Sequence, residues 1–287
     1  MKIQRIGDIT CELGEGPVWD AEEQALYFVD ILGKKIGRYD YAADAFATWS
    51  TKATVGSLAL RKEGGAIVAF GDGFGLFDFG SGDVTMLGDP EAHLPSTVWS
   101  DGKVDPRGRF LAGTVAIDQK SMICGLYSVD QGRITKLDDG FGITNGPCWS
   151  PDGRTFYYAD CVPCDIYAYD YDIETGAIAN RRVFANTRHL GGIPDGATVD
   201  TEGRLWSAIC MAGKIACWLP DGTLDRVIEV PPKFVSSVMF GGPKLDRLFV
   251  TSIYGPTLGF EADVVGGQLF VIDGLGATGL PEPRYAG

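Results

Sequence analysis

Four polar side chains that can bind a metal ion or hold a proton each stand directly before a glycine. They are Glu15, Asp101, Asn145 and Asp195. A short run follows each glycine and ends at an aspartate or a serine. Three carboxylates and one amide gathered in one place would repel one another unless a cation or a proton compensated. Oxygen ligands of these types suit one divalent ion, with calcium, magnesium and manganese as the first candidates and zinc as a further one.

The elements that would position these side chains recur along the chain. A turn followed by an apolar strand is repeated six times, at intervals of roughly 40 to 50 residues, which is the period of a propeller blade. The turns are marked by Glu23, Gly64, Gly108, Gly153, Gly203 and Asp246. A second short run with an aromatic residue follows each strand, and apolar residues alternate with period two within the runs.

This pattern predicts an all-β fold, a six-bladed β-propeller with four-stranded blades. Residues 1-287 are expected to form a single domain. Residues 1-10 are expected to pair with the last blade and close the ring, because an open ring leaves a bare strand edge. The four polar residues precede the turn markers, so we place them on the innermost strands. Ring symmetry would then bring them together at one mouth of the central channel.

Composition excludes several classes of function. The net charge of -13 leaves no basic surface for nucleic acid, and no stretch is apolar enough for a membrane helix. The first residues contain no apolar run typical of a signal peptide, which favours a cytoplasmic protein with reduced cysteines. Cys161 and Cys164 have redox or zinc spacing, but we interpret them as a turn with two incidental thiols. Two histidines are too few for a three-histidine zinc site. The sequence leaves the oligomeric state open.

Four motifs resemble those of the regucalcin, gluconolactonase and luciferin-regenerating enzyme family. They occur in the family's order and are Leu13–Trp19, Asn145–Pro147, Ser150–Gly153 and Pro194–Gly196. The resemblance covers nearly the whole chain and implies a six-bladed propeller that binds one divalent metal through Glu15, Asn145 and Asp195. It also implies hydrolysis of sugar lactones, with Asp195 as the suspected general base.

One departure from the family concerns the substrate. Sugar-lactone members tend to carry an Arg-x-Asn-Asp-Gly phrase that holds substrate hydroxyls, whereas this chain has Val98 and Ser100 at the arginine and asparagine positions, followed by Asp101. An apolar side chain in place of a five-donor guanidinium is not a conservative change. Ser100 and Asp101 remain the expected substrate-binding residues. A lactone with fewer hydroxyl groups than an aldonolactone is therefore expected.

Turn chemistry is the competing interpretation of Glu15, Asn145 and Asp195, but their equivalent positions in three blades favour a metal site. Asp101 fits a channel wall, a fourth polar contact or a capped turn. We assign structural or surface roles to the turn residues Asp152 and Asp200, the packing residues Trp19, Trp149 and Trp206, and the surface residues His93 and His189. Contact with substrate is left open for Trp99 alone.

The leading functional hypothesis is a metal-dependent lactonase that acts on a small-molecule substrate. Asp195, or alternatively Asp101, would take the proton from the attacking water. A non-catalytic regulatory propeller with a structural metal is the alternative from another class, since fold alone does not decide function. A third hypothesis is a propeller hydrolase or lyase that acts on a different, less polar substrate.

Overall fold

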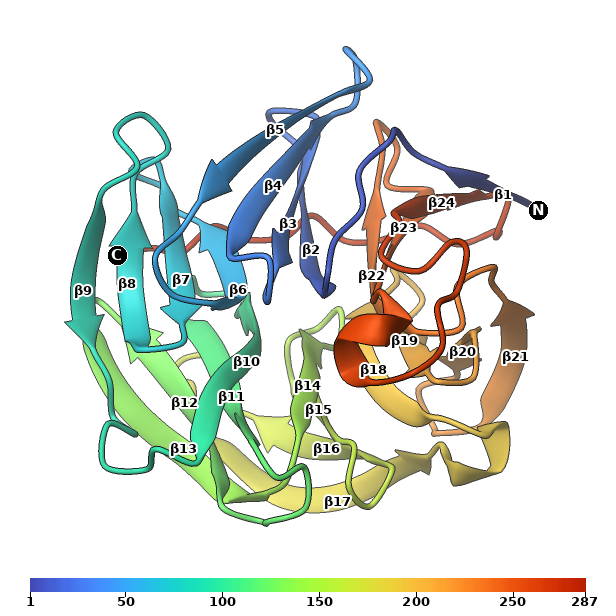
Figure 1. Cartoon of the computed structure of the whole chain (residues 1–287). Helices are drawn as coiled ribbons and strands as arrows, with labels where there is room; N and C mark the ends of the chain where they lie inside the picture. The colour runs from blue at the N-terminus through green and yellow to red at the C-terminus, as the bar shows by residue number, and fades with distance from the viewer.

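A computed structural model describes residues 1–287 of the chain. Six sheets of four antiparallel strands surround a central axis (Figure 1). This arrangement confirms the predicted all-β, six-bladed propeller with four-stranded blades. The remaining regular elements are two 3-10 helices, η1 (Arg188–Leu190) and η2 (Gly255–Leu258). No helix is long and apolar enough to cross a membrane.

Each of the first five sheets is a run of consecutive strands, with the first strand innermost. The first sheet contains β2 (Gly14–Asp20), β3 (Ala25–Asp30), β4 (Lys35–Asp40) and β5 (Ala45–Ser50). The second contains β6 (Val55–Leu60), β7 (Ala66–Phe70), β8 (Gly73–Phe77) and β9 (Val84–Gly88). The third contains β10 (Thr97–Val104), β11 (Phe110–Ala116), β12 (Cys124–Asp130) and β13 (Arg133–Phe141).

The second half of the ring repeats this order until the last sheet. The fourth sheet contains β14 (Thr144–Trp149), β15 (Thr155–Asp160), β16 (Asp165–Tyr171) and β17 (Ile178–Asn186). The fifth contains β18 (Ile193–Val199), β19 (Leu205–Cys210), β20 (Lys214–Trp218) and β21 (Leu224–Glu229). The sixth contains β22 (Val235–Gly241), β23 (Arg247–Ser252), β24 (Phe270–Asp273) and the N-terminal β1 (Lys2–Arg5), whose Ile3 pairs with Ile272.

The hydrophobic core lies between the blades. Six clusters of buried apolar side chains each join one sheet to the next around the ring. Trp19 of the first sheet, for example, stacks on Phe249 of the sixth at a centroid distance of 5.2 Å. Trp149 and Trp206 are likewise buried in these clusters. The prediction that these tryptophans pack between blades is confirmed.

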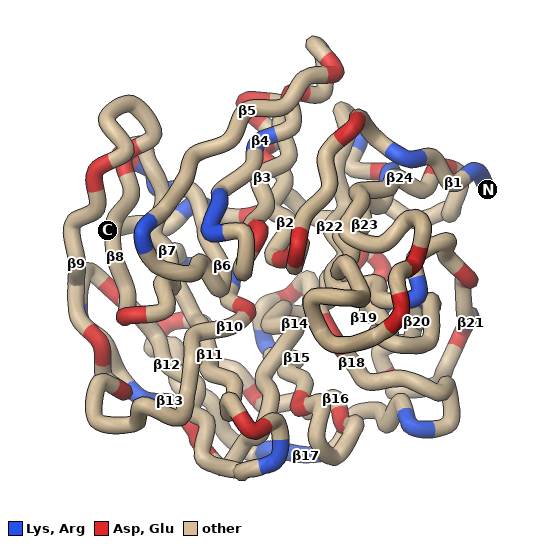
Figure 2. The backbone as a smooth tube through the Cα atoms, in the orientation of Figure 1, with Lys and Arg blue, Asp and Glu red and all other residues tan.

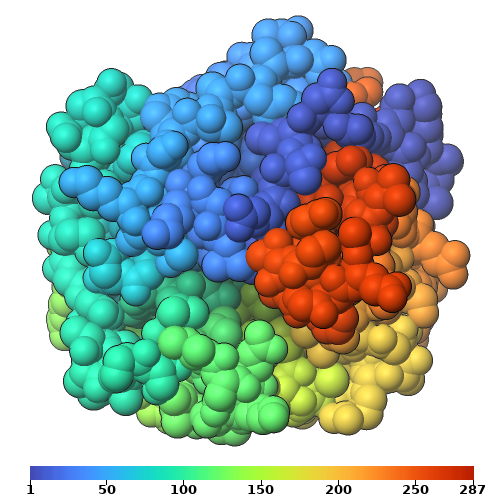
Figure 3. Space-filling model, in the orientation of Figure 1, coloured from blue at the N-terminus to red at the C-terminus, as the bar shows by residue number.

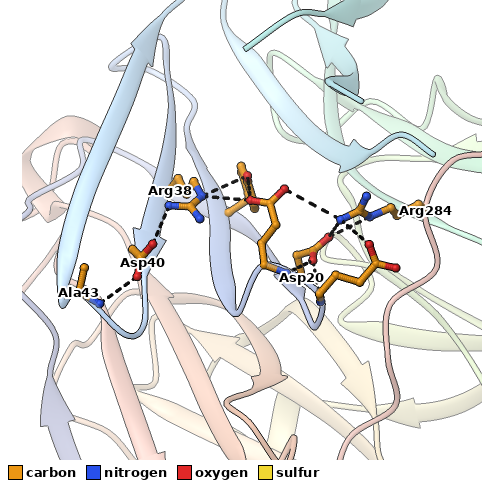
Figure 4. Close-up of polar contacts among 8 residues, drawn as sticks. Asp20, Arg38, Asp40, Ala43 and Arg284 are labelled. Atoms are coloured by element: carbon orange, nitrogen blue, oxygen red, sulfur yellow. Dashed lines mark hydrogen bonds and ion pairs between the residues drawn. The ribbon is translucent and has the colours of Figure 1, made fainter. Parts of the chain in front are cut away.

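An aspartate terminates several inner strands on the face opposite the mouth. In the third and fifth sheets it pairs with an arginine four residues later, as in the 2.6 Å contact between Asp200 and Arg204 Nε. The first sheet has no such arginine, and Arg284 of the C-terminal segment bonds Asp20 Oδ2 through Nε at 2.9 Å and Nη2 at 2.6 Å (Figure 4). These contacts confirm Asp200 as a turn residue.

The C-terminal segment, residues 274–287, ties several blades together on this face. Its backbone hydrogen bonds reach Thr201 of the fifth sheet, Leu60 of the second and Gly108 of the third. The segment passes behind the inner strands in Figure 1. It therefore covers the end of the channel that lies opposite the mouth formed by the starts of the inner strands.

Candidate functional site

A bulge near the start of the inner strand presents each of the four predicted side chains. The register of strand pairing shifts between Glu15 and Val18, between Asn145 and Cys148, and at the corresponding places in β10 and β18. A bulge redirects one side chain out of the regular alternation. Gly16 and Gly146 have φ angles of 50° and 58°, a left-handed conformation that glycine adopts without steric cost. In β2 and β14 the glycine that follows the polar residue therefore permits this geometry.

Glycine also allows the inner strands to approach one another closely. A Cβ atom at Gly196 would lie 1.8 Å from Ser237 Oγ of the neighbouring inner strand, and one at Gly146 would lie 2.8 Å from the carbonyl oxygen of Asp195. The inner strands contact one another around the axis as a result. Side chains at equivalent positions therefore converge, as ring symmetry predicts.

Three carboxylates meet at the centre of the ring. Glu15, Asp101 and Asp195 are 6%, 8% and 6% exposed. Burial, followed by the charges of Asp195 and Asp101, raises the pKa of Glu15 well above its usual range. Burial, followed by the charge of Asp101, raises the pKa of Asp195 to about 8. In Figure 2 acidic segments surround the centre of the ring. The cluster therefore retains at least one proton at neutral pH unless a cation neutralises it.

Asp101 is the carboxylate most engaged with the backbone. Its Oδ1 accepts a hydrogen bond from Gly102 N at 2.9 Å, and its Oδ2 accepts one from Gly146 N on the next inner strand at 2.9 Å. Burial raises its pKa, while Lys103 and these two N–H groups lower it. Asp101 thus fixes the spacing of two inner strands and contributes negative charge to the channel wall.

Asn145 turns its amide oxygen to the channel. Its Nδ2 donates a hydrogen bond to Cys161 Sγ at 3.2 Å, and its Oδ1 accepts no hydrogen bond within the protein. Cys161 in turn donates to the carbonyl oxygen of Pro194 at 3.0 Å. The predicted turn with two free thiols is confirmed, and Cys161 makes in addition two contacts, to Asn145 and to the next blade, that the sequence did not indicate. Cys164 is partly exposed and takes no part in these side-chain contacts.

Two further residues of the site were missed from the sequence. Cys210, at the end of β19, lies beside Asp195, and its thiol lowers the pKa of this carboxyl group. Burial raises the pKa of the Cys210 thiol well above its usual range, so the group is a neutral donor. Lys103 projects into the channel, where its Nζ lies 3.1 Å from the carbonyl oxygen of Ala197 and 3.5 Å from Glu282 Oε1. For Cys210 the one available signal was its position. It ends the second strand of its blade, and Cys161 directly follows the second strand of its own blade.

The remaining predicted residues have simpler surroundings. Ser100 is buried, and its carbonyl oxygen accepts a hydrogen bond from Ser57 Oγ at 2.8 Å. Val98 is exposed at the mouth. Trp99 packs on Phe74 with ring centroids 4.2 Å apart and is buried, so the structure favours packing over contact with substrate. His93 and His189 are exposed, and the turn residue Asp152 accepts from Ser150 Oγ at 2.6 Å.

The donor set fits a hard divalent cation. No three His, Cys, Asp or Glu side chains are arranged as a ready metal cage. The predicted set instead combines the carboxylates of Glu15 and Asp195 with the amide oxygen of Asn145, which is free of other hydrogen bonds. Oxygen atoms of this kind are the ligands that calcium and magnesium take, and a cation here would relieve the repulsion that raises both carboxyl pKa values.

Comparison with known proteins identifies close relatives. The profile described as "SMP-30/Gluconolactonase/LRE-like region" matches residues 13–254. Regucalcin of Danio rerio is 34% identical over 285 residues, which cover 96% of this chain and 95% of regucalcin. A solved luciferin-regenerating enzyme superposes with a TM-score of 0.94 at 28% identity, covering 99% of both chains. The calcium-binding protein regucalcin of Agrobacterium tumefaciens superposes with a TM-score of 0.91 at 28% identity, covering 98% of this chain and 96% of that one.

Proposed function

Because the chain belongs to the SMP-30/Gluconolactonase/LRE-like family, we propose that it is a divalent-metal-dependent hydrolase that opens a lactone ring. One observation carries the proposal. Two buried carboxylates with raised pKa values and one free amide oxygen converge at the channel mouth, where a third carboxylate already binds the backbone. This arrangement serves both to hold a cation and to accept a proton from water.

A bound divalent cation supplies Lewis acidity, which polarises the lactone carbonyl and offsets the negative charge that develops on its oxygen. Glu15, Asn145 and Asp195 are the residues that would hold the ion. Calcium, magnesium or manganese fits these oxygen donors better than zinc, because the thiols of Cys161 and Cys210 have raised pKa values and act as hydrogen-bonding groups.

Asp195 is the proposed general base. Its carboxylate takes a proton as the oxygen of water bonds to the carbonyl carbon, and the ring carbon–oxygen bond then breaks. Returning that proton to the departing ring oxygen yields the hydroxy acid and regenerates the carboxylate. Asp101 is less suited to this role, since both of its oxygens already accept backbone hydrogen bonds. We assign Asp101 and Ser100 to the wall that contacts substrate.

A less hydroxylated lactone is the proposed substrate. Val98 is exposed at the mouth, where it offers no hydrogen bond to a hydroxyl group. A site that binds a hydroxyl discriminates strongly against analogues that lack it, whereas an apolar wall discriminates weakly. The double variant Val98→Arg, Ser100→Asn is therefore expected to shift the ratio of kcat/KM toward glucono-δ-lactone and away from γ-butyrolactone.

The test couples metal content to activity. Elemental analysis of purified protein should find about one divalent ion per chain, and a pH-indicator assay should find lactone opening that a chelator abolishes and the same metal restores. Asp195→Asn should lose activity and Asn145→Ala should lose metal, while the matched turn variant Asp152→Asn should keep both. Full metal occupancy without turnover of any lactone would favour the regulatory propeller, and full occupancy in Asn145→Ala would remove this residue from the site.

A further inference from the structure

The exposed large apolar side chains of this protein are unevenly distributed over the surface. Of the fifteen such side chains, ten lie on loops or strand ends at the channel mouth, so most of them share the face with the carboxylates. We call these ten the apolar rim: Leu32, Val98, Ile117, Met122, Ile123, Met211, Tyr254, Leu258, Phe260 and Val264.

The topology of the blades gathers these residues on one face. Nine belong to loops that join the second strand of a blade to the third, and these loops lie beside the starts of the inner strands. Ile117 N, for example, donates to the carbonyl oxygen of Ser96 at 2.9 Å, just before β10. Tyr254 N donates to the carbonyl oxygen of Glu12 at 3.1 Å, just before β2. In Figure 3 the orange segment that includes η2 bulges toward the viewer over this face.

An apolar path connects the rim to the carboxylates on the side of the fifth and sixth blades. The ring of Phe260 lies 5.0 Å from that of Phe234. Phe234 packs with Cys210 and Ile253 in a small buried cluster, against which Leu13 and Ile193 pack in part. Cys210 lies beside Asp195, the proposed base. A hydrocarbon group that leaves the reacting centre in this direction would therefore meet apolar side chains as far as the surface.

The opposite side of the mouth contains a cavity with a mixed lining. A cavity of about 240 Å³ between the second and third blades is lined in part by Leu94, Pro95 and Val98. Its two acidic residues are engaged by neighbours: Asp89 accepts from Trp99 Nε1 at 3.3 Å, and Glu91 accepts from Thr97 and Tyr127. Leu94, Pro95 and Val98 belong to the apolar part of a lining that is otherwise largely polar, so the continuous apolar path lies on the side of the fifth and sixth blades.

We propose that the apolar rim binds the hydrocarbon substituent of the substrate, and hence that the substrates are lactones with an alkyl or aryl side chain. This inference rests on the proposed lactonase function. Charge favours this occupant over an anionic lipid surface, because the chain carries a net charge of -13 and the rim surrounds buried carboxylates. Of the carboxylates near the rim, Asp118 and Asp263 accept hydrogen bonds within or beside their own loops, and Glu261 is exposed next to Phe260.

The experiment measures how kcat/KM depends on the length of the lactone side chain. In metal-loaded protein, kcat/KM is measured for γ-butyrolactone, γ-hexalactone, γ-octalactone and γ-decalactone, with glucono-δ-lactone as the polar reference. Burial of one methylene group is worth up to roughly a fourfold change, so kcat/KM should rise about two- to fourfold per added methylene. Phe260→Ser and Met122→Ser should flatten this rise on opposite sides of the mouth. The control Val183→Ser removes an even more exposed side chain from the outer strand β17 and should leave the rise unchanged.

Each outcome decides a different point. A flat series with measurable turnover of γ-butyrolactone or glucono-δ-lactone refutes the rim proposal and leaves the lactonase function standing. No turnover of any lactone refutes both. A flat series combined with sedimentation on phosphatidylcholine vesicles that Phe260→Ser abolishes would assign the rim to a membrane surface and refute its role in substrate binding.

Discussion

Removal of the metal should make the stability of this protein depend on pH between 6 and 8. The pKa of Asp195 is raised from about 3.8 to about 8 in the folded, metal-free chain, chiefly by burial. A carboxyl group whose folded pKa lies above its unfolded pKa stabilises the protein while it is protonated, and this contribution is lost as pH rises through the folded pKa. The chelated protein should therefore be more stable at pH 6 than at pH 8.

The size of the effect follows from the linkage between protonation and folding. Between pH 6 and pH 8 the unfolded carboxyl group is already ionised, whereas the folded group is protonated at pH 6. Because only the folded state binds this proton, the free energy of unfolding falls by about 2 kcal/mol over this range. For a chain of this length that corresponds to a fall in Tm of roughly 3 to 4 °C. The coupled titration of Glu15 acts in the same direction, because its pKa is raised as well.

The assay is a set of thermal melts at pH 6, 7 and 8, with excess chelator and with excess calcium. Calcium-loaded protein should show a nearly constant Tm, because the cation takes the place of the proton. Chelated Asp195→Asn should lose less stability over this range than the chelated unmutated chain. Equal slopes with calcium and with chelator, or a Tm of the chelated protein that rises with pH, would refute the account of the carboxylate cluster.

Two further predictions concern residues that join separate parts of the ring. Arg284→Ala should lower the free energy of unfolding by about 1 to 2 kcal/mol, because the buried Asp20 carboxylate loses its guanidinium partner. Arg5→Ala, which removes an exposed pair, should leave Tm within about 1 °C of the unmutated value, and an equal loss in both would contradict this assignment. Cys161→Ala should lower metal affinity about tenfold by releasing the Asn145 amide, whereas Cys164→Ser should not, as metal titration would show. Equal affinities in the two cysteine variants would refute an orienting role for Cys161.

The sequence predicted the inner three strands of each blade better than the outer one. Inner strands are short apolar runs between turns rich in glycine and aspartate, and the repeated phrase marks where they begin. Outer strands such as β9 and β13 are partly exposed and interrupted by bulges, so no alternating pattern distinguishes them from loops. The ring geometry followed from the repeat alone.

The candidate site was predicted only where the repeated phrase carries it. Glu15, Asp101, Asn145 and Asp195 occupy equivalent positions, and symmetry brings equivalent positions together. Cys161 could not be recognised this way, because its role depends on a contact with Asn145 across a sheet and with the backbone of the next blade. The sequence favoured a turn with two incidental thiols, and the structure adds these two contacts of Cys161 to that turn.

The C-terminal segment shows most clearly what a repeat cannot predict. In the third and fifth blades an arginine four residues after the strand-ending aspartate completes the turn, as with Arg204 and Asp200. The first blade has Gln24 at this position, so its Asp20 accepts hydrogen bonds from the turn backbone but lacks a local cation. Arg284 supplies the missing cation from a chain distance of 264 residues. Because the same segment places Glu282 beside Lys103, which lies beneath Asp101, the closure of the ring and the electrostatics of the site depend on one stretch of chain.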